Sequence, residues 1–159
     1  MILVLLGTQN NSFHRLLEEI QKNIDNGNIK EEVIVQKGYT KFESENMTLY
    51  NQLPADKIMK LTEKADLVIT HGGVGSIINS IEKNKKVMAV PRLKKYNEHV
   101  NNHQLDIIKS FNDMEYIIGL NDVEELEEAL KKVKNFKPKP YIKNTGNILE
   151  IVANFIDNN

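Results

Sequence analysis

Residues 67–78, Leu67-Val68-Ile69-Thr70-His71-Gly72-Gly73-Val74-Gly75-Ser76-Ile77-Ile78, decide the fold of this chain. The stretch begins with an apolar run of the kind found in parallel strands that are covered on both faces. Three glycines within four positions follow, and they allow a sharp turn and the close approach of a ligand to the backbone. Ser76 is then placed to cap a helix with an apolar side. The sequence predicts a strand, a glycine turn and a helix.

The glycine turn has two interpretations. A helix N-terminus presents unpaired N–H donors and the positive end of the helix dipole, and both favour an anion such as phosphate. Glycines after a strand also occur in tight connections that bind nothing. The local pattern leaves a phosphate site and a plain strand-to-helix turn both open.

The composition is that of an ordinary globular domain. The chain has 159 residues, of which 40 % are hydrophobic and 27 % charged, and this suits one domain with a real core. Its formal net charge of -1 gives no general reason to expect nucleic acid as a partner. The absence of cysteine excludes disulfides and thiolate metal sites. His99 and His103 are four residues apart, but no acidic pattern accompanies them, so no metal site is expected.

The hydropathy pattern predicts a cytoplasmic protein. No segment approaches the roughly 20 apolar residues that cross a bilayer. The apolar start, residues 1–6, is too short for the core of a signal peptide and has no basic residues before it. We therefore expect it to be the first strand.

Segments typical of strands and helices alternate along the chain. The expected strands are residues 2–6, 32–36, 47–50, 67–69, 87–90 and 116–118. The expected helices begin after Ser12, at Pro54 and at the glycine turn, and cover residues 98–110, 123–133 and 147–156. Most strand segments are apolar rather than alternating, which favours a doubly wound parallel sheet with helices on both faces, in a single α/β domain of residues 1–159.

In such a sheet, ligands bind beyond the carboxyl ends of the strands. We expect residues 7–11, 71–76 and 92–104 to meet at this rim. In the last of these segments, Glu98 or Gln104 would bond vicinal hydroxyls of a sugar, with an arginine, Arg92, offsetting phosphate charge. The alternative is a solvated loop in which Asn97 or Glu98 caps a surface helix.

Taken together, these motifs resemble a known family. They are Leu6-Gly7-Thr8-Gln9, His71-Gly72-Gly73-Val74-Gly75-Ser76-Ile77, Val90-Pro91-Arg92 and Asn97-Glu98-His99-x-x-Asn102-His103-Gln104. They resemble the C-terminal, nucleotide-sugar-binding half of GT-B glycosyltransferases, and above all the small stand-alone proteins of glycosyltransferase family 28. That group includes bacterial capsule and exopolysaccharide proteins of the PssE and EpsF type, and the catalytic subunit of the two-part eukaryotic enzyme that extends dolichol-linked N-acetylglucosamine. The likeness covers nearly the whole chain.

The resemblance implies a Rossmann-like donor half of a split, inverting glycosyltransferase. It would move a hexose from a UDP-sugar to a lipid-linked saccharide in polysaccharide biosynthesis, with no cofactor besides the donor. The acceptor half would be a separate, membrane-associated subunit of the PssD type, which would hold this chain at the inner face of the membrane. A C-terminal helix at residues 144–159 would dock this partner, or would simply pack on its own sheet. Formation of a homodimer stays open.

The same resemblance implies roles for individual residues. The UDP diphosphate would be held by a turn that His71 orients, consisting of Gly72, Gly73, Val74, Gly75 and Ser76. The donor sugar would lie near Asn102, His103 and Gln104, and the acceptor cleft near Gly7 and Thr8. Family members often carry Glu or Asp where this chain has Asn79, so contact with the ribose would lack a charge.

The catalytic base has only local candidates in this chain, Glu98 and His99, and in this architecture it often lies on the acceptor half. A non-catalytic scaffolding subunit is therefore an alternative function, and Asn79 is its one sequence hint. A flavodoxin-like or nucleotide-binding regulator would explain the glycine turn but not residues 98–104.

Overall fold

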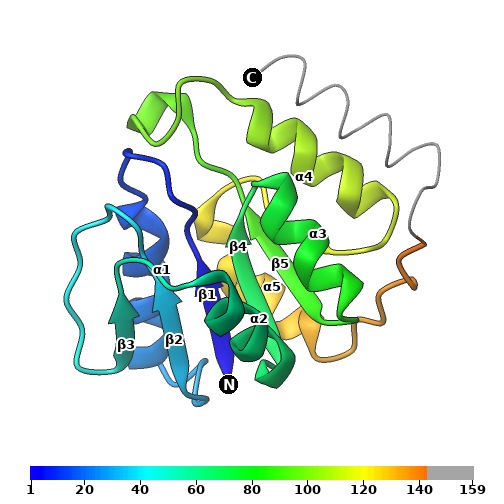
Figure 1. The fold of residues 1–159 in the computed structure, drawn as a ribbon, viewed down its shortest axis with the longest axis horizontal. Helices are drawn as coiled ribbons and strands as arrows, with labels where there is room; N and C mark the ends of the chain where they lie inside the picture. The colour runs from blue at the N-terminus through cyan, green and yellow to red at the C-terminus, as the bar shows by residue number, and fades with distance from the viewer. Residues whose placement is uncertain (143–159) are drawn as a thin grey trace.

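The computed structural model describes residues 1–142, so the expected helix at residues 147–156 and the docking segment 144–159 lie outside the described residues. Six parallel strands form one sheet in the order β3-β2-β1-β4-β5-β6 (Figure 1). The strands are β1 (Ile2–Leu5), β2 (Val33–Gln36), β3 (Met47–Tyr50), β4 (Leu67–His71), β5 (Lys86–Val90) and β6 (Ile118–Gly119).

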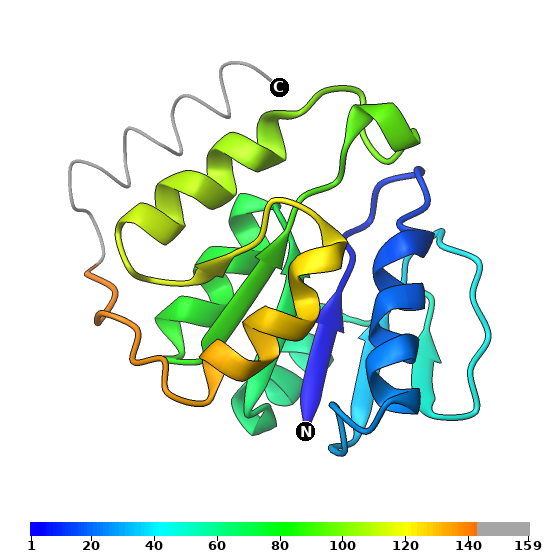
Figure 2. The ribbon, with the colours of Figure 1, turned by 180° about the vertical axis from the view of Figure 1, so that it is seen from behind.

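Helices cover both faces of this sheet, as Figures 1 and 2 show from opposite sides. One face carries α1 and α5, and the other carries α2, α3 and α4. The helices are α1 (His14–Asp25), α2 (Ala55–Lys64), α3 (Val74–Glu82), α4 (His103–Asp113) and α5 (Leu126–Val133), with 3-10 turns η1 (Lys94–Tyr96) and η2 (Val123–Glu125). The predicted doubly wound α/β fold is confirmed.

The central strands explain why the strand segments are apolar throughout. Every residue of β1 and β4 is buried, because each strand has helices on both sides. Val4 and Ile69 pack toward α1 and α5, whereas Leu3 and Val68 pack toward α3 and α4. Two apolar layers therefore enclose one sheet.

Two predicted helix caps are wrong. The N-cap of α1 is Phe13, not Ser12, and the N-cap of α3 is Gly73, so Ser76 lies inside the first turn of α3. Tertiary contacts set the first boundary, because Phe13 is fully buried and its N–H donates to Thr40 Oγ1 at 2.9 Å. In α3 the chain becomes helical directly after the two adjacent glycines.

Three further boundaries differ from the prediction. Residues 98–102 are not helical, and α4 begins at His103, whose N–H is accepted by Asn101 Oδ1 at 3.0 Å. The last strand is shifted to Ile118–Gly119, and the segment 123–133 begins as η2 before it becomes α5. The early start at residue 98 fails because Asn97 has a left-handed φ of 57° and Glu98 is drawn into the interior.

The sheet order reverses between β1 and β4, and this is where doubly wound folds form a ligand crevice. The first rim loop (residues 6–13) follows β1, and the glycine turn follows β4. The second rim loop (residues 91–102) follows β5. The three segments expected at the rim therefore lie at the same edge of the sheet. Within residues 1–142, no helix has the length and apolar character to cross a membrane.

Candidate functional site

The N-terminus of α3 is open. Gly73 is at the N-cap, no side chain caps the helix, and no acidic residue lies in its first turn. A Cβ added at Gly75 would meet nothing within 4 Å, so this part of the turn faces free space. The first N–H groups of a helix lack intrahelical partners and carry the positive end of its dipole. This end of α3 can therefore receive an anion.

The imidazole of His71 fills the space between two glycines. An added Cβ would lie 2.6 Å from His71 Nε2 at Gly7 and 2.5 Å from His71 Cε1 at Gly73. Gly7 also has a positive φ of 80°, which side chains rarely adopt. Both glycines are therefore required by the histidine ring, whether or not a ligand binds beside them.

The side-chain amide of Gln104 determines which nitrogen of His71 carries the proton. Its Oε1 accepts 2.9 Å hydrogen bonds from the backbone N–H groups of Gly72 and Arg92. Its Nε2 therefore donates to His71 Nδ1, 3.1 Å away, and the proton of the neutral ring is assigned to Nε2. Burial lowers the pKa of His71 to about 3. His71 thus presents a neutral N–H donor beside the glycine turn.

Arg92 joins the two rim loops below the surface. Its guanidinium donates to the carbonyl oxygens of Leu6, of Asn11 at 2.8 Å and of Glu98 at 3.1 Å. The side chain is 1 % exposed, and burial lowers its pKa to about 10. The expected contact with phosphate is not the arrangement seen, because these donors are directed at backbone carbonyls. Arg92 acts here as a clamp between loops.

Glu98 is enclosed by donors. Arg15 Nε donates to Glu98 Oε2 at 2.8 Å, and Arg15 Nη2 and the N–H of Leu93 donate to Oε1, both at 3.0 Å. The residue is 2 % exposed. A general base must reach the proton that it removes, and both oxygens of this carboxylate are held inside the protein. The geometry gives Glu98 a structural task.

His99 lies where the two rim loops meet. Its Nδ1 accepts from the N–H of Asn101 at 3.3 Å, and its Nε2 is 3.0 Å from the side-chain amide of Gln9. Gln9 Nε2 is an amide nitrogen that can only donate, so His99 Nε2 is the acceptor of that contact. Burial, with a smaller effect from Arg92, lowers the pKa of His99. In this arrangement both ring nitrogens of His99 face N–H donors of the protein, and neither is free to act as a base.

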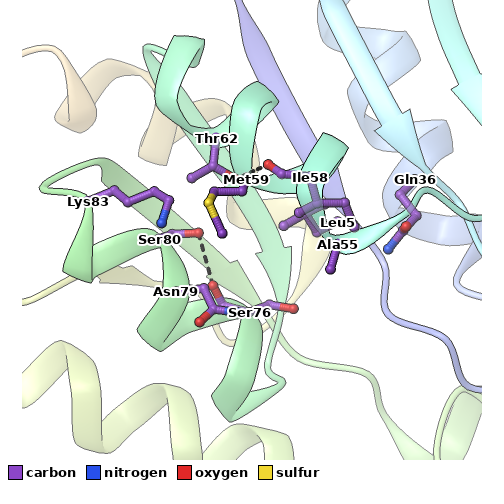
Figure 3. A pocket seen from close by; sticks show the side chains of 10 residues that line it. All are labelled: Leu5, Gln36, Ala55, Ile58, Met59, Thr62, Ser76, Asn79, Ser80 and Lys83. Carbon is purple, nitrogen blue, oxygen red and sulfur yellow. Dashed lines mark hydrogen bonds between the residues drawn. The ribbon is translucent and has the colours of Figure 1, made fainter.

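A pocket of about 240 Å³ lies between α2 and α3, beside the ends of β1 and β2 (Figure 3). Its apolar wall comes chiefly from α2 and its polar wall from α3. No carboxylate lines the pocket, and Lys83 is its one charged side chain. Its lining consists of Leu5, Gln36, Ala55, Ile58, Met59, Thr62, Ser76, Asn79, Ser80 and Lys83. The pocket thus combines an apolar wall with a polar one, as small-molecule sites commonly do.

The structure does not bring all of the expected site residues together. Gly7, His71, Gly72, Gly73 and Gln104 form one buried or half-buried cluster, whereas Gly75, Ser76 and Asn79 face open space or the pocket. Val74 is the first residue of α3, and Thr8 is exposed in the first rim loop. Asn102 Oδ1 accepts from the N–H of Lys94 at 2.9 Å, and His103 opens α4. Within residues 1–142, no group of three or more His, Asp or Glu side chains is placed to hold a metal ion.

Sequence reasoning missed several residues of the site. Arg15 contacts the second rim loop through Glu98, and Asp122 supports Arg15. Met59 and Lys83 line the pocket. These residues belong to no local motif, since Arg15 is 83 positions from Glu98, and only the fold brings them together.

Comparison with known proteins gives the family of the chain. The model of the glycosyltransferase family 28 C-terminal domain matches residues 1–158. The chain belongs to this family. As a family 28 domain it is similar to the UDP-N-acetylglucosamine transferase subunit ALG13 of Candida albicans, with 32 % identity over 83 residues. That match covers 52 % of this chain and 27 % of the Candida protein. The chain spans less than half of the length of the curated relatives that it matches.

Solved structures share the fold of this family 28 domain. The NMR solution structure of ALG13 has a TM-score of 0.62 at 18 % identity, covering 95 % of this chain and 93 % of that one. The Streptomyces glycosyltransferase SsfS6, solved with thymidine diphosphate, has a TM-score of 0.56 at 17 % identity, covering 98 % and 37 %. At such identities the likeness shows the architecture alone.

Proposed function

We propose that this family 28 domain is the donor-binding, catalytic subunit of a two-component inverting glycosyltransferase. It would transfer a hexose, such as N-acetylglucosamine, from a UDP-sugar to a lipid-linked saccharide in the synthesis of a capsule or exopolysaccharide. One observation carries the proposal. The open N-terminus of α3 adjoins the pocket between α2 and α3, and Ser76 and Asn79 extend from the first turns of α3 into that pocket.

The geometry suggests how the donor would lie. The diphosphate would bind the N–H groups at the start of α3, where Gly75 leaves the backbone bare. The Nε2–H of His71 would add a neutral donor beside it. The uridine would enter the pocket, with its ring against Met59 and its ribose near Asn79. The sugar would then point toward the rim loops, where Gln9 and His99 meet.

A partner subunit is part of the proposal because inverting transfer needs a base for the acceptor hydroxyl. Glu98 and His99 have their basic atoms engaged within the chain. The base and the acceptor site would therefore come from a membrane-associated, PssD-like subunit, which would place this domain at the inner face of the membrane. The relative ALG13 is itself named as a subunit of a transferase.

Donor binding can be tested on the purified chain. Titration with UDP, followed by two-dimensional NMR, should shift the amide signals of Gly75, Ser76 and Asn79 with saturable behaviour. Cytidine and adenosine diphosphates serve as controls for the pocket, and inorganic phosphate as a control for the α3 N-terminus alone. Absence of UDP binding both with and without the co-expressed membrane subunit would sink the proposal.

A scaffolding subunit is the second candidate, and the engaged state of Glu98 and His99 favours it. Such a subunit would activate a partner that carries its own donor site. Co-expression with the partner separates the two functions. If a Gly75→Glu variant leaves transferase activity of the pair intact, the chain is a scaffold, and if activity is lost while the pair still co-purifies, it binds the donor.

A further inference from the structure

Arg15 connects three parts of the molecule. It lies in the first turn of α1 and forms a bidentate ion pair with Glu98 in the second rim loop. Its Nη1 donates to Asp122 Oδ1 at 2.7 Å, at the N-cap of η2. Its guanidinium also stacks on the ring of Tyr96, 3.7 Å from the ring centroid. One side chain thus ties the loop after β5 to α1 and to the loop after β6.

The ion pair with Arg15 allows the Glu98 carboxylate to be buried. The carboxylate is 3 % exposed, against 23 % for the Arg15 side chain. A buried carboxylate without its partner is strongly unfavourable, so loss of Arg15 would expel Glu98 or draw in water. Either change moves the backbone at residue 98.

That backbone carries His99. The carbonyl of Glu98 accepts from Arg92 Nη1 at 3.1 Å, and the next residue, His99, meets Gln9 across the rim. Asn11 Nδ2 donates to the carbonyl of Asn97 at 2.9 Å on the other side of Glu98. Arg15 holds the side chain of Glu98 from below, while these bonds hold its flanks. The placement of His99 therefore depends on Arg15.

The exposed residues of the second rim loop indicate why the loop needs Arg15 to hold it in place. Lys94, Lys95 and Val100 are exposed, and Val100 is 75 % exposed. After Pro91, Leu93 is the buried apolar residue of this loop. The exposed residues of the loop therefore do not hold it by apolar packing. Polar contacts set the position of the second rim loop. Among them, the bidentate pair of Arg15 and Glu98 joins two charged side chains.

We propose that Arg15 is a positioning residue for the donor sugar. Through Glu98 it would fix the position of the Gln9 and His99 side chains that face the sugar. Arg15 itself would not touch the ligand. This inference rests on the proposed donor site. The nucleotide end of that site, formed by α3 and the pocket, has no contact with Arg15, so the two ends should respond differently to its loss.

The test compares two ligands on the same variants. UDP and UDP-N-acetylglucosamine are titrated into the wild-type chain, Arg15→Met, Arg15→Lys and the double variant Arg15→Met/Glu98→Met, with binding followed by NMR. The double variant removes both charges and so avoids an unpaired buried carboxylate. Lys131→Met is the matched control, because it breaks an exposed ion pair with Glu128 on α5.

We expect Arg15→Met and the double variant to bind UDP as the wild type does and to bind UDP-N-acetylglucosamine about tenfold more weakly, the loss of one good polar contact. Arg15→Lys keeps the charge but not the two-pronged geometry, so its affinity for the sugar nucleotide should fall in between. The control should match the wild type for both ligands.

A purely structural role would give another result. Variants that remain folded and lose affinity for both ligands equally, or for neither, overturn the positioning role. The pH titration of the His99 ring signals gives a readout without ligand, since release of the loop should return its lowered pKa toward that of a free histidine. An unchanged His99 titration in Arg15→Met also refutes the inference. Failure of the wild type to bind UDP refutes the donor site instead, so the two failures are distinguishable.

Discussion

The side-chain amide of Gln104 donates to Nδ1 of His71 across 3.1 Å, and the same amide accepts from two backbone N–H groups. Those N–H groups belong to Gly72 and Arg92, which follow β4 and β5. One amide in the first turn of α4 thus connects the carboxyl ends of two central strands. At 3 % exposure, with its amide engaged on both sides, Gln104 supports the glycine turn rather than reaching out to a sugar.

Replacing this amide should destabilise the fold. Gln104→Ala leaves the N–H groups of Gly72 and Arg92 buried without partners, and each such group costs about 1–3 kcal/mol. We therefore expect the free energy of unfolding, measured by urea titration, to fall by about 2–5 kcal/mol. Asn102→Ala is the control, because the exposed Asn102 accepts one bond from the N–H of Lys94, and its loss should cost about 1 kcal/mol. Equal losses in the two variants would contradict the role given to Gln104.

Gly75 allows a clean test of the anion site. Gly73 does not, because any Cβ there collides with His71 and disturbs the fold by itself. At Gly75, alanine should stabilise α3 by about 0.5–1 kcal/mol, as replacement of a helical glycine usually does. Glutamate at this position favours the helix dipole but places a negative charge where the diphosphate would lie. Gly75→Glu should therefore remain as stable as the wild type and lose UDP affinity by at least about tenfold.

The comparison of Gly75→Ala with Gly75→Glu separates bulk from charge. Thermal unfolding and UDP titration are measured on both variants. A Gly75→Glu variant that binds UDP with wild-type affinity would show that the N-terminus of α3 is not the phosphate site, and that the turn is a plain strand-to-helix connection.

Asn79 provides a prediction in which affinity increases. It is exposed on α3 and lines the pocket, where a carboxylate could accept bonds from both ribose hydroxyls. Hydrogen bonds to charged groups contribute about 1 kcal/mol more than neutral ones, so Asn79→Glu should tighten UDP binding about fivefold. The gain should shrink with 2′-deoxy-UDP, which lacks one hydroxyl. An equal gain for both nucleotides, or none, would mean that the ribose lies elsewhere.

The architecture was predictable because buried parallel strands leave a strong mark. The residues of β1 and β4 face apolar layers on both sides, so their apolar runs are not interrupted by alternation. The helix starts were less predictable. Ser12 and Ser76 match the composition of N-caps, but the contact of Phe13 with Thr40, 27 residues away, and the turn at Gly73 set the actual boundaries.

The site was predictable in part for the same reason. The glycine turn is local in sequence, so its position at the end of β4 followed from the pattern. The roles of Glu98 and Arg92 did not follow, because their partners Arg15 and Leu6 are 83 and 86 positions away. Polar residues next to a predicted rim were assigned to a ligand, whereas several of them hold the rim together. The pocket depends on how α2 packs beside α3, and no single motif encodes that.

His71 should make the stability of the fold depend on pH. Its pKa is lowered from 6.5 to about 3, chiefly by burial, so below pH 6.5 the unfolded chain binds a proton that the folded chain does not. Stability from this group is complete above pH 6.5 and is lost as the pH falls toward 3. Its contribution to the slope reaches about 1.4 kcal/mol per pH unit. The lowered pKa of His99 acts in the same direction.

Urea unfolding at a series of pH values from neutral down to mildly acidic checks this dependence. His71→Asn keeps an acceptor near the position of Nδ1 but cannot titrate. Its free energy of unfolding should therefore change less steeply with pH than that of the wild type, by up to the contribution of one bound proton. His14→Asn is the control, because the His14 side chain is 48 % exposed and its loss should leave most of the slope in place. If His71→Asn retains the full slope of the wild type, the ring of His71 takes up its proton equally in the folded and the unfolded chain, and the assignment of a lowered pKa to this buried ring is wrong.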